Sequence, residues 1–102
     1  MLHFSKDRFD KALSQGKLMM VDFWADWCGP CRMLGPVIEQ LADRYPDVVV
    51  GKVNVDDEQE LALRYGVMSI PTVIFFKDGK EIDRKVGVMP PEAFTRVLDD
   101  NK

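Results

Sequence analysis

Two cysteines separated by two residues form the segment Cys28-Gly29-Pro30-Cys31, and they are the only cysteines among 102 residues. A disulfide that closes so short a loop would stabilise the fold by only about 2 kcal/mol, because it removes little chain entropy from the unfolded state. Secreted scaffolds instead distribute several cysteines along the chain. The pair therefore predicts thiol chemistry rather than a structural cross-link.

The elements around this segment explain how the thiols would react. An apolar run of strand length at 18–24 precedes it, and helical spacing follows it to about Tyr45. Cys28 then lies at or near a helix N-terminus, where free N–H groups and the helix dipole favour a thiolate. Cα atoms three positions apart in a helix lie roughly 5 Å from each other, within the range of an unstrained disulfide. We therefore expect Cys28 to attack a target disulfide and Cys31 to resolve the mixed disulfide.

Two other uses of a cysteine pair fit the sequence poorly. A structural zinc ion needs four ligands, and beyond the cysteines the chain offers only one histidine, His3, at its far end. A Cys–His hydrolase would also need a placed histidine. We therefore expect no metal site.

Asp22 is a carboxylate within an otherwise apolar strand. Burial disfavours the charged form, so we expect a raised pKa. Strand alternation places Asp22 on the same face as Trp24, beneath the start of the cysteine-bearing helix. Two interpretations fit: a base that takes the proton of Cys31, or a carboxylate near the strand end that local partners satisfy.

Lys52 is the only cation in the apolar run Val-Val-Val-Gly-Lys-Val-Asn-Val at 48–55. Its long side chain could carry the ammonium group to the surface. It could equally lie near Asp22 and tune that carboxyl group. The run alone leaves both interpretations open.

Apolar spacing and turn residues predict that strands and helices alternate along the chain. Asp78-Gly79 between two apolar runs is a strong signal for a two-residue hairpin turn. The sequence therefore predicts a mixed α/β sheet, parallel at first and antiparallel at the hairpin, covered by helices. The expected strands are 1–4, 18–24, 48–55, 72–77 and 80–86, and the expected helices run from Ser5 or Asp7 to Gly16, from the cysteines to about Tyr45, over 56–65, and from Pro90-Pro91 onward.

Composition restricts the function further. Apolar residues make up 46% and charged residues 30%, with a net charge of -3 and no long basic run, so we expect no nucleic-acid partner. No apolar run approaches the length of a membrane span. The N-terminus shows no secretory signal, so we expect a cytoplasmic protein.

Several motifs follow one another along the chain. They are Val21-Asp22-Phe23, Trp24-Ala25-Asp26-Trp27-Cys28-Gly29-Pro30-Cys31, Lys52-Val53-Asn54-Val55-Asp56, Tyr65-Gly66-Val67, Ile70-Pro71-Thr72, Phe76-Lys77-Asp78-Gly79 and Val86-Gly87. In this order they resemble the thioredoxin family, over about 4–98. The Gly-Pro dipeptide is similar to that of thioredoxins rather than to those of disulfide isomerases. The resemblance implies a five-stranded mixed sheet flanked by four helices, formed as a single domain over 1–102.

The resemblance assigns roles to the supporting residues. It implies that Asp22 accepts the proton of Cys31 and that Lys52 tunes Asp22. It also implies a cis peptide bond between Ile70 and Pro71, facing the cysteines, which leaves the Ile70 backbone free to pair with an extended client segment.

An apolar docking platform is expected around the nucleophile, Cys28. Trp27 lies beside this nucleophile, which we expect to be exposed, and glycines let a client backbone approach closely. The expected members are Trp27, Gly29, Pro30, Ile70, Pro71, Val86, Gly87 and Val88.

The implied activity is the reduction of disulfides in client proteins, by a monomer that needs no bound cofactor. The implied partners are an NADPH-dependent thioredoxin reductase and clients such as ribonucleotide reductase, peroxiredoxins and methionine sulfoxide reductases. These roles serve electron transport and cell redox homeostasis. Two alternatives are an oxidant or isomerase, and a thioredoxin-fold binding module or chaperone subunit with incidental redox activity.

Overall fold

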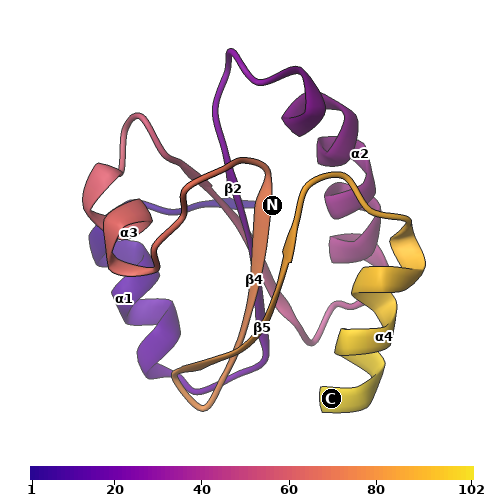
Figure 1. Cartoon of the computed structure of the whole chain (residues 1–102). Coiled ribbons are helices and arrows are strands. Elements are labelled where there is room, and N and C mark those ends of the chain that lie inside the picture. The colour runs from indigo at the N-terminus through magenta and orange to yellow at the C-terminus, as the bar shows by residue number, and fades with distance from the viewer.

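A computed structural model describes residues 1–102. Five strands form one sheet in the order β1-β3-β2-β4-β5. Helices α1 and α3 cover one face of the sheet, and α2 and α4 cover the other (Figure 1). The elements are β1 (Leu2–His3), α1 (Lys6–Ser14), β2 (Met19–Trp24), α2 (Gly29–Arg44), β3 (Val49–Asn54), α3 (Gln59–Arg64), β4 (Thr72–Lys77), β5 (Lys80–Val86) and α4 (Pro91–Asn101). The predicted mixed sheet with four helices is confirmed.

Strand β2 lies at the centre of the sheet and leads directly to the cysteine segment. It pairs in parallel with β3 and antiparallel with β4. Strand β3 also pairs in parallel with β1, and β4 forms an antiparallel hairpin with β5. The cysteines therefore follow the strand in the middle of the sheet, with two strands on either side of it.

Local sequence signals account for the element ends. The Ser5 side chain accepts a hydrogen bond from the Arg8 N–H at the start of α1. Asp78 and Gly79 both have positive φ, 54° and 77°, as a two-residue turn between twisted strands requires. The bounds of β4 and β5 equal the predicted ones.

Helix α3 begins later than the sequence predicts. Its first residue is Gln59, whereas the apolar spacing places the start at Asp56. The Asn54 side-chain oxygen accepts hydrogen bonds from the N–H groups of Asp56 (2.9 Å) and Asp57 (3.4 Å). This side-chain turn competes with the first helical turn, and the predicted start was wrong for that reason.

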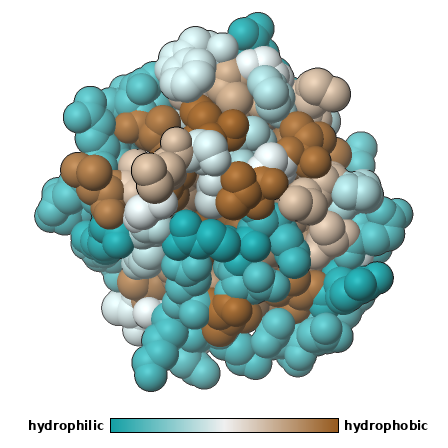
Figure 2. All heavy atoms as spheres, in the orientation of Figure 1, coloured by the Kyte–Doolittle hydropathy of each residue, from teal (hydrophilic) through white to brown (hydrophobic).

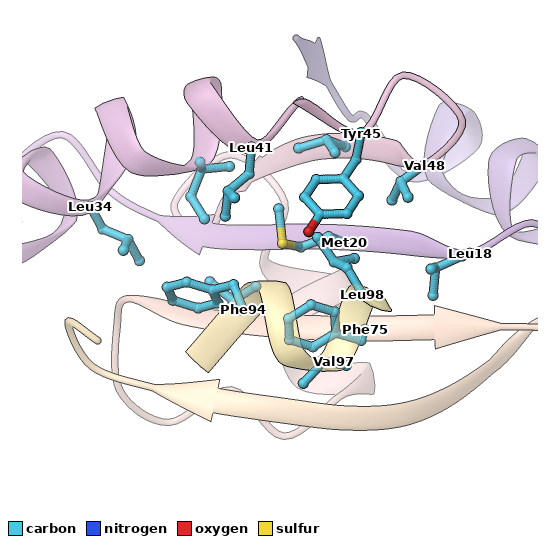
Figure 3. Packing of buried hydrophobic residues seen from close by; sticks show 13 residues of the cluster. Leu18, Met20, Leu34, Leu41, Tyr45, Val48, Phe75, Phe94, Val97 and Leu98 are labelled. Atoms are coloured by element: carbon cyan, nitrogen blue, oxygen red, sulfur yellow. The ribbon is translucent and has the colours of Figure 1, made fainter. Parts of the chain in front are cut away.

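Both faces of the sheet are packed with apolar side chains. On the face of α2 and α4, Met20 and Phe75 belong to one buried cluster with residues of both helices, including Leu41 and Phe94 (Figure 3). On the opposite face, Phe9 and other aromatic rings pack edge to face. Helix α2 is thus fixed against the sheet along its buried side, which fixes the cysteines at its N-terminus. Each helix is too short or too polar to cross a bilayer.

Candidate active site

Cys28 is the N-cap residue of α2, and Cys31 lies in its first turn. The two cysteines form a disulfide, and their Cα atoms lie 5.3 Å apart, close to the predicted spacing. The Cys28 Sγ accepts a hydrogen bond from the Cys31 N–H at 3.2 Å. In the reduced protein, the same N–H is placed to stabilise a Cys28 thiolate. Pro30 occupies the first turn, where its missing N–H leaves no partner unsatisfied.

The expectation of an exposed nucleophile is wrong for the disulfide state. Cys28 is 4% exposed and Cys31 is 3% exposed. Both pack with Ala25, and Trp24 and Ile70 lie against this small cluster. The Cys28 Sγ lies 3.8 Å from the carbonyl oxygen of Ile70. In the disulfide state the Cys28 sulfur is therefore almost closed to solvent, with the Ile70 backbone beside it.

Asp22 is fully buried in the central strand. No protein group donates a hydrogen bond to either carboxylate oxygen. Burial raises the pKa of Asp22 from 3.8 to about 6, and the positive charge of Lys52 opposes this rise only in part. The raised pKa is confirmed. Local partners do not satisfy the carboxylate, so the second interpretation of Asp22 has no support from its contacts.

Lys52 lies opposite Asp22 in the β2–β3 register. Its Nζ lies 4.6 Å from the centroid of the Trp24 ring, as in a cation–π contact. It is a member of none of the salt bridges of the chain. An ideal Cβ at Gly35 of α2 would lie 3.7 Å from Nζ, so the ammonium group is held between the sheet and α2. Its influence on Asp22 is therefore exerted through space.

The peptide bond between Ile70 and Pro71 is cis, as expected. The Pro71 carbonyl accepts a hydrogen bond from the Gly87 N–H at 2.8 Å, which joins this segment to the end of β5. The N–H and C=O of Ile70 take part in no backbone hydrogen bond within the protein. Beside Cys28 the chain thus presents a backbone with free donor and acceptor groups.

Apolar side chains surround this backbone. Trp27 is 67% exposed, and Val86 and Val88 are each about half exposed. Gly29 and Pro30 are exposed, whereas Pro71 is buried. Figure 2 shows apolar residues mainly over the upper and middle parts of one face, towards the end where Figure 1 places the β2–α2 loop. A shallow groove of about 330 Å³ is lined by Trp27, Val55, Val67, Met68, Ser69 and Ile70.

One contact was not anticipated from the sequence. The Trp27 indole N–H donates a hydrogen bond of 2.8 Å to the Asp56 carboxylate. Asp56 follows β3, and no local pattern identifies it as the partner of a residue 29 positions earlier. His3, by contrast, lies in β1, and no cluster of three or more His, Cys, Asp or Glu side chains could hold a metal ion.

Comparisons with known proteins agree with this geometry. The family model described as Thioredoxin matches residues 1–100. A thioredoxin of Chlamydia caviae is 46% identical over 97 residues, which cover 95% of this chain and 94% of that protein. The crystal structure of Fasciola hepatica thioredoxin superposes with a TM-score of 0.93 at 38% identity and covers 100% of both chains.

A third similar chain comes from a structure that addresses the thiol resolving mechanism in yeast mitochondrial 1-Cys peroxiredoxin via glutathione/thioredoxin systems. It is 31% identical, with a TM-score of 0.89, and the match covers 98% of this chain and 94% of that one. A disulfide at a helix N-terminus and matches of this extent lead to one assignment. The chain belongs to the thioredoxin family and is a protein-disulfide oxidoreductase that exchanges a dithiol for a disulfide.

Proposed function

We propose that Cys28 is the nucleophile and Cys31 the resolving thiol in the reduction of client disulfides. The observation that carries this assignment is the place of Cys28 as the N-cap of α2, with its sulfur facing the Cys31 N–H. Cys31 lies in the first turn of α2, and its N–H donates to the Cys28 sulfur, so this contact favours a thiolate on Cys28. Attack from outside therefore falls to Cys28.

The electrons and protons balance in two steps. The Cys28 thiolate attacks one sulfur of the client disulfide, which forms a mixed disulfide and releases the other client sulfur as a thiolate. Cys31 then loses its proton and attacks the Cys28 sulfur, which releases the second client thiolate. The client gains two electrons and two protons, and the protein is left with the Cys28–Cys31 disulfide.

Trapping of the mixed disulfide tests this order. Cys31→Ser should hold clients covalently on Cys28, because no thiol remains to release them. Cys28→Ser should trap few clients and should not reduce insulin disulfides. Equal trapping by both variants, or no trapping by either, would contradict the assignment.

We propose that Asp22 accepts the proton of Cys31 during the second step, directly or through water. A pKa of about 6 supports this role, because the carboxylate is then ionised at neutral pH yet able to hold a proton. Asp22→Asn should slow insulin reduction while the reaction of Cys28 with an alkylating agent stays unchanged. Unchanged turnover at neutral pH would exclude the role.

Lys52 is proposed to keep the Asp22 carboxylate ionised at neutral pH. Its charge lowers the pKa of Asp22, against the larger effect of burial. Without this charge the carboxylate would hold its proton to a higher pH and would be a poorer acceptor at neutral pH. The contact of Lys52 with Trp24 supports a fixed position for the charge.

We propose that clients dock as an extended segment on the backbone of Ile70, with Trp27, Gly29, Pro30, Pro71, Val86 and Gly87 around it. Free N–H and C=O groups at Ile70 can form the hydrogen bonds of an added strand. The Sγ of Cys28 lies 3.8 Å from the Ile70 carbonyl, so a segment paired there brings its sulfur to the nucleophile. Trp27→Ala should raise the KM for a protein client and leave the reaction of Cys28 with a small alkylating agent unchanged.

The chain is proposed to act in the cytoplasm as a monomer and as one domain over 1–102, recharged by an NADPH-dependent thioredoxin reductase. Proposed clients are ribonucleotide reductase, peroxiredoxins and methionine sulfoxide reductases. The similarity to a chain from a peroxiredoxin study supports the peroxiredoxin class. Insulin reduction coupled to NADPH and candidate reductases tests the recharging of the protein. Trapping by Cys31→Ser identifies the clients. No turnover with any reductase would contradict the proposed recharging route.

A further inference from the structure

The exposed Trp27 side chain is held by a residue that lies in no helix or strand. Its indole N–H donates to Asp56, which belongs to the turn between β3 and α3. The indole is 67% exposed, so packing alone does not fix its orientation. The position of the indole beside Cys28 therefore depends on whatever holds that turn in place.

Asn54, the last residue of β3, holds this turn through its side chain. Its Oδ1 accepts hydrogen bonds from the N–H groups of Asp56 (2.9 Å) and Asp57 (3.4 Å). Its backbone carbonyl accepts from the Glu58 N–H at 2.9 Å. One residue thus fixes the three positions that precede α3.

The same amide also contacts the loop that carries Trp27. The Asn54 Nδ2 donates to the Asp26 carboxylate at 3.4 Å. Asn54 is paired in register with Trp24, so its backbone is anchored to the central strand just before that loop. The amide therefore joins both sides of the Trp27–Asp56 hydrogen bond: the residue before the donor and the turn that carries the acceptor.

We propose that Asn54 is a positioning residue for client docking, which holds the Trp27 indole in place through the Asp56 turn. This inference rests on the proposed docking role of Trp27. An amide suits the position because it offers an acceptor and a donor at once. The Asp26 carboxylate, which accepts from this amide, makes a neutral side chain preferable to a second carboxylate here.

Two substitutions separate the functions of the amide. Asn54→Ala removes the acceptor and the donor together. Asn54→Asp keeps an acceptor for the N–H groups of the turn. It loses the N–H donor to Asp26 and adds a negative charge beside the Asp26 carboxylate. Asn101→Ala is a matched control, because the Asn101 Nδ2 donates to the Val97 carbonyl within α4, away from the cysteines.

The rate at which the Trp27 indole proton exchanges with water, measured by NMR, reports whether its hydrogen bond to Asp56 is kept. Asn54→Ala should speed this exchange by about three- to tenfold, the range expected for loss of one ordinary hydrogen bond. It should raise the KM for insulin by a similar factor, with kcat and the alkylation rate of Cys28 unchanged. Asn54→Asp should retain most of the protection of the indole proton, and Asn101→Ala should change neither quantity.

A double-variant cycle distinguishes this role from a merely structural one. If Asn54 acts through Trp27, Asn54→Ala should raise KM in the native background but not in Trp27→Ala. Additive effects on KM, or an unchanged indole exchange rate in Asn54→Ala, would overturn the proposal. If Trp27→Ala itself leaves KM unchanged, the proposed docking role of Trp27 fails, and the proposal for Asn54 fails with it.

Stability is checked first by thermal unfolding of each variant. Should Asn54→Ala fail to fold, Asn54→Ser takes its place, because a hydroxyl group makes the same turn more weakly. An intermediate rise in indole exchange and in KM is then expected. No change in either quantity would overturn the proposal.

Discussion

Replacement of Asp22 by asparagine should stabilise the oxidised protein, and the gain should depend on pH. Asp22 is fully buried, and burial raises its pKa from 3.8 to about 6. That rise corresponds to about 3 kcal/mol, because each tenfold change in an ionisation constant is worth about 1.4 kcal/mol. Asparagine has nearly the same shape and does not titrate.

The direction of the stability change with pH depends on whether the folded or the unfolded chain holds the Asp22 proton. Between pH 3.8 and about 6 the folded protein retains a proton on Asp22 that the unfolded chain releases. Stability from this group is therefore full below the unfolded pKa and is lost as the pH rises through the folded pKa. The free energy of unfolding of Asp22→Asn, relative to the native chain, should grow by about 2–3 kcal/mol from about pH 4 to about pH 8.

Urea unfolding of the oxidised proteins, measured at several pH values, tests this prediction. The oxidised state is used because neither cysteine then titrates. Asp43→Asn, on the exposed side of α2, is the control and should show no such growth. A stability difference between Asp22→Asn and the native chain that stays constant across this pH range would refute the reasoning.

Three further predictions concern Lys52, the core and β3. Lys52→Met should raise the pKa of Asp22, because the opposing charge is lost, and the pH profile of insulin reduction should move to higher pH. Phe94→Ala should lower the free energy of unfolding by about 3–5 kcal/mol in urea, since the ring is fully buried. Gly51→Ala should cost about 1–3 kcal/mol in the same assay, because its Cβ would overlap the ring of Phe4.

The sequence predicts most of the fold because its strong signals are local. The hairpin bounds follow from two residues, Asp78 and Gly79, and of the two starts predicted for α1, Ser5 and Asp7, the structure has Ser5 as the cap. The start of α3 was wrong because the decisive contact is the Asn54 side chain, which replaces the first helical turn with a side-chain turn. Apolar periodicity carries no information about that competition.

The candidate site likewise has features that the local sequence predicts and features that it does not. The spacing of Cys28 and Cys31 and the raised pKa of Asp22 follow from residue types within one strand and one helix turn. The burial of the Cys28 sulfur and the contact of Trp27 with Asp56 depend on how distant segments meet. Such contacts are set by tertiary packing, which single-residue preferences do not encode.

The central place of β2 in the sheet has a consequence for hydrogen exchange. Opening free energies vary across a protein, from nearly zero at frayed edges to the full unfolding energy in the core. Strand β2 is flanked by β3 and β4, and its residues Met19–Phe23 are almost fully buried, whereas β1 is a two-residue edge strand. The amides of β2 should therefore exchange only through global unfolding, while β1 exchanges through local fraying. Because α2 begins a few residues after β2, the cysteine pair remains attached to the last part of the sheet to open, and the edges can fray without disturbing it.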